Sequence, residues 1–81
     1  MVDMQEFQTR IALHYPDRVV RVRGEGPWGA PSMVLTSNGE DQPMYFNPVF
    51  LERDIGYVIE ETIMYIDNRW PASVKPRREL I

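Results

Sequence analysis

The sequence predicts a single α+β domain in the order α-β-β-β-α, with a three-stranded antiparallel meander packed against a long C-terminal helix. Three observations carry this prediction. Apolar residues recur at helical spacing near the start of the chain and again after residue 47. Apolar and polar residues alternate between residues 18 and 46, as in strands with one wet face. Asn38-Gly39 is the dipeptide that most favours a two-residue hairpin turn.

The length of 81 residues suits one domain. We divide the chain into a folded part, residues 1–70, and a basic C-terminal tail with prolines, residues 71–81. The tail shows no apolar periodicity, and a docking segment that orders on binding is the alternative to a loose terminus.

The first helix has a strong start signal. Asp3 can cap it, and Glu6 follows three residues later, as in a capping box. Pro16 ends it, because the residue before a proline is disfavoured in the α region. The face turned to the core carries apolar residues at helical spacing: Met4, Phe7, Ile11 and Tyr15.

The next segments predict strands joined by turns. Val20 and Val22 alternate with arginines in the first strand, and residues 24–31 (GEGPWGAP) are expected to form a loop. The Asn38-Gly39 turn would pair Leu35 with Gln42 and Met33 with Met44. The inner face would then hold Met33, Leu35, Met44 and Phe46, and the wet face Val34, Thr36 and Tyr45.

Two prolines bound the last elements. Pro43 cannot donate a ladder hydrogen bond, so the third strand is expected at an edge of the sheet. Asn47 and Pro48 form a helix start, and we expect one continuous helix from there to about Arg69. Its core stripe would be Leu51, Ile55, Val58, Ile59, Thr62, Ile63 and Ile66.

Composition narrows the function classes. The net charge of −3 disfavours nucleic acid as a partner, because such binders usually carry a basic excess. The absence of cysteine excludes disulfides and thiolate chemistry and suits the cytoplasm. No apolar run reaches the roughly 18–20 residues of a membrane span. We therefore expect a cytoplasmic protein that does not enter membranes.

Catalytic and metal-binding patterns are not recognisable. His14 is the only histidine, and no motif joins a nucleophile, a base and an orienting group. The loop at residues 24–29 differs from a phosphate loop, because Pro27 interrupts it, Glu25 repels anions, and a strand follows. We therefore predict no catalytic residue, no cofactor and no metal site.

A second apolar line on the last helix is the main candidate for a partner surface. Phe50, Tyr57 and Met64 are seven residues apart and would lie opposite the core stripe of a continuous helix. Arg53 and Glu61 would lie beside them, which is a pattern typical of interfaces. The alternatives are that single exposed apolar residues are common, and that Phe50 packs under the first strand.

Trp28 is a further candidate for contact with the same partner. A tryptophan among glycines and prolines either folds back onto the sheet edge or stands exposed as a hot spot. Of the two interpretations, we favour the folded-back one.

The element order over residues 3–69 resembles the double-stranded-RNA-binding domain. That resemblance implies a lysine cluster at the start of the last helix, where this chain has Glu52, Arg53 and Asp54. Two fragments, residues 38–42 (NGEDQ) and 65–80 (YIDNRWPASVKPRREL), look like pieces of MbtH-like proteins, which bind peptide-synthetase adenylation domains. The segment between them is short for that fold, and Phe46 stands near the position of the family's first tryptophan.

These observations lead to three hypotheses. The first is a non-enzymatic protein-binding module, an acidic adaptor or inhibitor of a larger protein, of a kind common among phage and mobile-element proteins. The second is a nucleic-acid-binding domain that uses Arg18, Arg21 and Arg23 with the tail bases. The third is a homo-oligomeric structural protein, in the simplest case a homodimer that forms through the second apolar line of the last helix.

Overall fold

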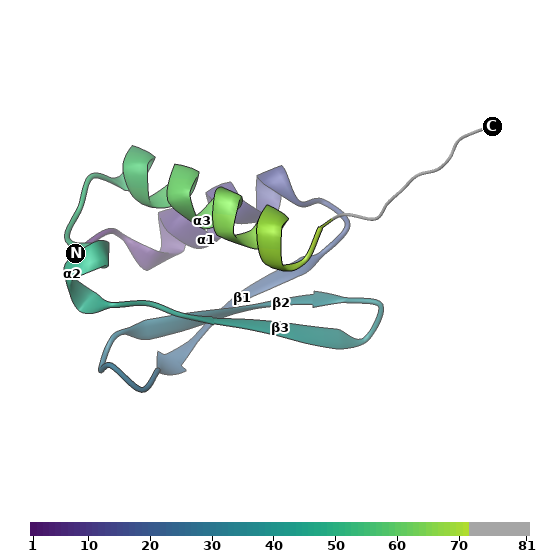
Figure 1. The fold of residues 1–81 in the computed structure, drawn as a ribbon, viewed down its shortest axis with the longest axis horizontal. Coiled ribbons are helices and arrows are strands. Elements are labelled where there is room, and N and C mark those ends of the chain that lie inside the picture. The colour runs from purple at the N-terminus through teal and green to yellow at the C-terminus, as the bar shows by residue number, and fades with distance from the viewer. Residues whose placement is uncertain (72–81) are drawn as a thin grey trace.

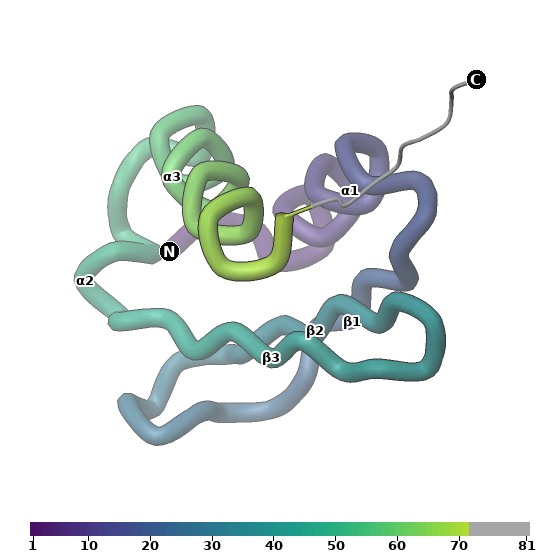
Figure 2. Tube along the Cα trace, turned by 45° about the vertical axis from the view of Figure 1, so that its right-hand side comes forward, coloured from purple at the N-terminus to yellow at the C-terminus, as the bar shows by residue number. Residues whose placement is uncertain are grey.

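The computed structural model describes residues 1–71 and confirms the order α-β-β-β-α, with the last helical segment in two parts. The elements are α1 (Met4–His14), β1 (Val19–Glu25), β2 (Pro31–Ser37), β3 (Glu40–Tyr45), α2 (Pro48–Leu51) and α3 (Ile55–Arg69). The strands form one antiparallel sheet in the order β1-β2-β3. Helices α1 and α3 lie side by side over one face of this sheet (Figures 1 and 2). Within residues 1–71, no element covers the other face.

The start of α1 follows the predicted cap. The Asp3 carboxylate accepts hydrogen bonds from the backbone N–H groups of Gln5 and Glu6, at 2.8 and 3.3 Å. The Glu6 carboxylate lies 3.0 Å from the Arg10 guanidinium, four residues further along the helix. The cap therefore satisfies two of the free N–H groups that every helix start leaves.

The predicted register of the β2–β3 hairpin is confirmed. Leu35 pairs with Gln42, and Met33 pairs with Met44. Asn38 and Gly39 have φ angles of 53° and 77°, the positive values that a type I′ turn needs. The predicted inner face (Met33, Leu35, Met44 and Phe46) is buried under the helices.

The loop expected over residues 24–31 is shorter than predicted. Strand β1 continues to Glu25 through a bulge at Gly24, and β2 begins at Pro31. The backbone N–H of Gly26 donates to the Ala30 carbonyl at 2.8 Å, which closes the turn over residues 26–30. A bulge adds one residue to a strand while the strand stays paired with its neighbour. The glycine pattern of the sequence alone does not indicate such a bulge.

Both edge strands of the sheet lack one backbone group that would otherwise be free for pairing. Strand β3 is an edge, as predicted, and the alternation from the Ser37–Glu40 pair points the Pro43 nitrogen away from β2. On the other edge, the Gln8 side-chain amide donates to the Val20 carbonyl at 2.9 Å. Proline and side-chain capping each remove a group that a foreign strand would need for pairing.

The prediction of one continuous helix after Pro48 is wrong. Helix α2 ends at Leu51, whose carbonyl accepts a hydrogen bond from the backbone N–H of Val2 at 2.8 Å. Helix α3 then starts anew with Asp54 as its cap, because the Asp54 carboxylate accepts from the N–H of Gly56 at 3.0 Å. A long-range hydrogen bond and a new cap thus replace the turn that would join the two helices.

The core stripe of the last helical segment is confirmed in part. Leu51, Val58 and Ile66 are fully buried, together with Phe7 and Ile11 of α1. Three other members of the stripe are only half-buried against the core: Ile55, Ile59 and Ile63. No helix within residues 1–71 is long and apolar enough to cross a membrane.

Candidate binding groove

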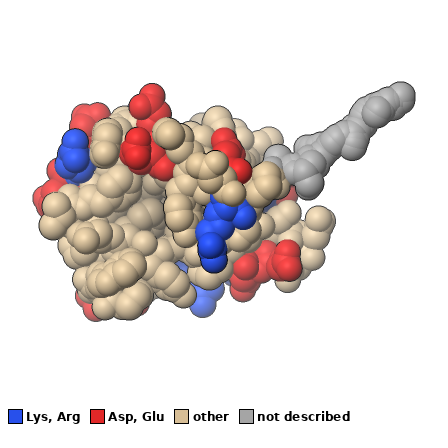
Figure 3. Space-filling model, in the orientation of Figure 1, with Lys and Arg blue, Asp and Glu red and all other residues tan. Residues whose placement is uncertain are grey.

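An aromatic groove of about 440 Å³ lies between α3 and the strand β3, and is closed at one end by α2 and the β1–β2 turn. Five aromatic side chains line it: Trp28, Tyr45, Phe46, Phe50 and Tyr65. The remaining lining residues are Met44, Asn47, Glu61 and Thr62. In Figure 3, the lower left of this face is a broad surface without charged side chains. Acidic side chains lie above it, and basic side chains lie at the upper left and to its right.

A series of ring contacts connects the groove to the core. Phe46 follows the last residue of β3, and its ring lies 5.4 Å from that of the fully buried Phe7. On its other side, Phe46 stacks on Phe50 of α2 at 6.2 Å, with 12° between the ring planes. Because α2 begins immediately after β3, with Asn47 as its cap, Phe50 is held against the end of the strand. The groove floor is therefore part of the packed core.

Trp28 lies at the mouth of the groove, on the turn between β1 and β2. Gly26 packs against the Tyr45 ring so closely that an added Cβ would lie 2.9 Å from Tyr45 Cδ1. Gly29 in the same turn has a φ of 80°. These two glycines hold the turn beside Tyr45. Trp28 lies beside the edge strand β3, where it lines the groove with Tyr45 and Phe46, and yet it stays 60% exposed. Its position therefore combines the two interpretations, the folded-back one and the exposed one.

The groove has three polar lining residues among residues 1–71: Asn47, Glu61 and Thr62. Glu61 is exposed and is the only charged one of these described lining residues. Thr62 is 3% exposed, and its hydroxyl oxygen has no hydrogen-bond partner among the described residues. Buried polar atoms almost always have a partner, so the Thr62 hydroxyl is an exception among the described residues, and its oxygen is not accessible from the groove.

The residues predicted to form a partner surface are only partly brought together. Phe50 and Glu61 line the groove with Trp28. Tyr57 adjoins it, since its ring lies 6.2 Å from Phe50, and the Arg53 guanidinium carbon lies 4.2 Å from the centre of the Tyr57 ring. Because the helix is broken before Asp54, Phe50 does not continue the line of the α3 residues.

Met64 of that predicted surface is 56% exposed and does not line the groove. Sequence reasoning missed Tyr45, Asn47, Thr62 and Tyr65 as groove residues. One signal was available for Tyr65, which lies four residues after Glu61 and so shares its helix face. The role of Tyr45 depends on the β1–β2 turn packing against it, which no local pattern shows.

The three arginines of the nucleic-acid hypothesis do not form one surface. Arg18 is 7% exposed, whereas the nucleic-acid hypothesis needs it at the surface. Its guanidinium donates to the Trp70 carbonyl at 2.9 Å and to Gln42 Oε1 at 3.5 Å, and it lies 4.9 Å from the centre of the Tyr15 ring. Arg21 and Arg23 are exposed, and the tail bases lie outside the described residues.

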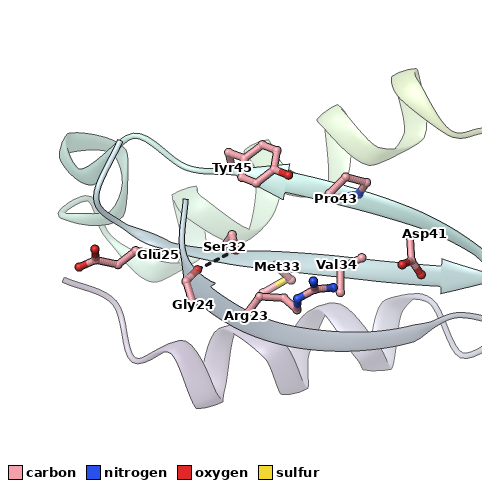
Figure 4. A pocket seen from close by; sticks show the side chains of 9 residues that line it. All are labelled: Arg23, Gly24, Glu25, Ser32, Met33, Val34, Asp41, Pro43 and Tyr45. Atoms are coloured by element: carbon pink, nitrogen blue, oxygen red, sulfur yellow. Dashed lines mark hydrogen bonds between the residues drawn. The ribbon is translucent and has the colours of Figure 1, made fainter. Parts of the chain in front are cut away.

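A second hollow, of about 400 Å³, lies on the uncovered face of the sheet (Figure 4). Arg23 shares it with two acids, Glu25 and Asp41, so it has no single sign of charge. The Ser32 hydroxyl donates to the Gly24 carbonyl at 2.8 Å and is therefore already partnered. Val34, predicted on the wet face, is 2% exposed because its neighbours on this face cover it.

The described residues show no metal centre. Across residues 1–71, no group of three or more His, Asp or Glu side chains could hold an ion. His14 is the last residue of α1, is exposed, and packs edge-on against the Tyr15 ring at 4.8 Å.

Comparison of the chain with protein-family models, with curated proteins and with solved structures finds no match. The two resemblances noted in the sequence therefore rest on element order and on two fragments alone. The function of this chain has to be argued from the groove itself.

Proposed function

We propose that this chain is a non-enzymatic domain that binds a larger protein through the aromatic groove. One observation carries the proposal: Trp28, Tyr45 and Tyr65, which line the groove, remain 60%, 51% and 48% exposed. Aromatic side chains are enriched at the centres of protein interfaces, where their burial supplies much of the binding energy. An open groove with aromatic walls on a rigid floor is therefore suited to a segment of another protein.

The sheet edges support a groove rather than strand addition. A partner that adds a strand needs free N–H and C=O groups along an edge. Pro43 removes such a donor on β3, and the Gln8 amide occupies the Val20 carbonyl on β1. The partner segment is accordingly expected to bind through its side chains.

The biological role is a further part of the proposal. The net charge of −3 and the absence of cysteine support an acidic adaptor or inhibitor that acts in the cytoplasm. A phage or mobile-element origin is an analogy with small proteins of this type. A nucleic-acid partner has less support, because Arg18 is buried in internal hydrogen bonds.

Affinity capture with matched variants tests the proposal. Tagged wild-type protein, Trp28→Ala and Leu13→Ala would each be incubated with extract of the source cell, and the retained proteins identified by mass spectrometry. Leu13 is the control, since it is an apolar residue 77% exposed outside the groove. We expect a protein that wild type and Leu13→Ala retain and Trp28→Ala loses.

Two results would contradict the proposal. One is an identical set of retained proteins for all three baits. The other is a concentration-dependent increase in mass, measured by light scattering, that Trp28→Ala abolishes. The second result would assign the groove to a second copy of this chain, in line with the homo-oligomer hypothesis.

A further inference from the structure

We propose that the groove accepts a cationic side chain, an arginine or a lysine, presented by the partner protein. This inference rests on the proposed function and specifies the chemistry of what the groove binds. Two features of the groove support it: its aromatic walls and its charge.

The walls suit a cation because aromatic rings carry negative charge on their faces. The domain already packs its own arginines in this way. The Arg53 guanidinium lies 4.2 Å from the Tyr57 ring centre, and those of Arg18 and Arg69 lie 4.9 and 5.6 Å from the rings of Tyr15 and Trp70. None of these arginines lines the groove, and no cation from residues 1–71 lies over the exposed rings of Trp28, Tyr45 and Tyr65.

The described lining residues give the groove one sign of charge. Among residues 1–71, Glu61 is the only charged residue that lines it, and Glu60 precedes it on α3. A cation held between aromatic faces and a carboxylate gains both the ring attraction and a charge-assisted hydrogen bond. An acidic partner side chain would face Glu61 with no compensating base among the described lining residues.

Glu61 supplies the hydrogen-bond acceptor for the bound group, since its side chain is exposed and lines the groove. Guanidinium and ammonium groups carry several N–H donors, so one of them can donate to the Glu61 carboxylate while the cation lies over an aromatic ring. The Thr62 hydroxyl oxygen is already buried and takes no part in this contact.

The size of the groove fits an arginine or lysine with part of its neighbouring residues. The long apolar stem of such a side chain packs along aromatic surface while its charged end stays hydrogen-bonded. A volume of about 440 Å³ lies within the range of sites that enclose small ligands.

The test is an NMR titration of the full chain with N-acetyl-arginine amide and with N-acetyl-citrulline amide, which has nearly the same shape and no charge. The indole N–H resonance of Trp28 reports on the mouth of the groove. We expect saturable shifts with the arginine compound and at least tenfold weaker binding of the citrulline compound. Equal affinity for the two compounds, or no saturable shift with either, would overturn the inference.

Matched variants locate the cation. Glu61→Gln should weaken binding of the arginine compound about tenfold, as loss of a charge-assisted hydrogen bond predicts. Glu60→Gln is the control, because Glu60 is an exposed acid next to Glu61 that does not line the groove. It should change the affinity less than twofold. Equal losses for both variants would show a diffuse electrostatic effect and would contradict a specific site.

The outcomes separate this inference from the proposed function. If Trp28→Ala loses a captured protein but the arginine compound does not bind, the groove binds a protein segment of other chemistry. If the chain self-associates and Glu61→Gln dissociates it, the bound group belongs to a second copy, whose sequence offers Lys75, Arg77 and Arg78. Either result overturns the assignment of a partner's cationic side chain.

Discussion

The Tyr15 hydroxyl donates a hydrogen bond to the Asp67 carboxylate over 2.7 Å, and so ties the end of α1 to the last turns of α3. The same hydroxyl lies 3.2 Å from the Ile63 carbonyl, and the Arg18 guanidinium lies over the Tyr15 ring. These contacts tie the C-terminal end of α1 to the C-terminal half of α3.

Tyr15→Phe should lower the free energy of unfolding by about 1–2 kcal/mol, because it removes the hydroxyl that Asp67 accepts from. Asp67→Asn is a useful comparison, since it keeps an acceptor without the charge and should cost less. Urea melts of the three proteins measure these differences. Equal stability of wild type and Tyr15→Phe would show that the hydrogen bond contributes nothing.

The same hydrogen bond predicts a dependence on alkaline pH. Burial, and then the hydrogen bond and charge of Asp67, raise the pKa of Tyr15 well above its ordinary value near 10. The folded state therefore holds this proton more tightly than the unfolded state. The stabilisation is complete below about pH 10 and is lost as the pH rises further. Wild type should lose stability in this range more steeply than Tyr15→Phe.

Alanine should destabilise the protein at Gly39, in the hairpin turn, but not at Gly24, in the bulge of β1. An added Cβ meets nothing within 4 Å at either Gly39 or Gly24, but only Gly39 has a positive φ, of 77°. Gly39→Ala should therefore cost about 1–2 kcal/mol from backbone strain alone. Gly24→Ala should stay within about 0.5 kcal/mol of wild type. Similar melting curves for the two variants would contradict a positive φ at Gly39.

Alanine substitutions on α3 should destabilise the protein more, the more deeply the replaced side chain is buried. Ile66 is fully buried, and Ile66→Ala should cost about 2–5 kcal/mol. Ile63→Ala should cost less, because Ile63 is only half-buried at a shallow hollow between α1 and α3. Glu60→Ala, on the exposed face, should change stability by less than about 0.5 kcal/mol. A larger loss from Ile63 than from Ile66 would show a different rotation of the helix.

Alanine substitutions of Arg18 and Arg21 distinguish a structural role from a binding role for the arginines in and next to β1. Arg18→Ala should cost about 1–3 kcal/mol, since it leaves the Trp70 carbonyl and Gln42 without their donor. Arg21→Ala, at an exposed position, should leave stability nearly unchanged.

We also expect no tight binding of wild type to duplex DNA or RNA at physiological salt. A submicromolar dissociation constant with a steep salt dependence would favour the nucleic-acid hypothesis.

The sequence by itself determined the features that depend on neighbouring residues. The Asp3 cap, the Asn38-Gly39 turn and the alternation through Leu35 and Met44 act over a few positions, and each is present as predicted. Register follows directly, because the side-chain period of two in a strand leaves one pairing that buries the apolar face.

The tertiary structure alone decided where the chain departs from those local patterns. The break between α2 and α3 depends on Val2, near the N-terminus, whose N–H donates a hydrogen bond to the Leu51 carbonyl. Arg18 is buried because its acceptors, Gln42 and the Trp70 carbonyl, lie 24 and 52 positions away. The groove likewise joins Trp28, Phe50 and Tyr65 from three separate elements. Contacts between such distant positions leave no period or motif in the sequence, because they form only when the helices pack onto the sheet.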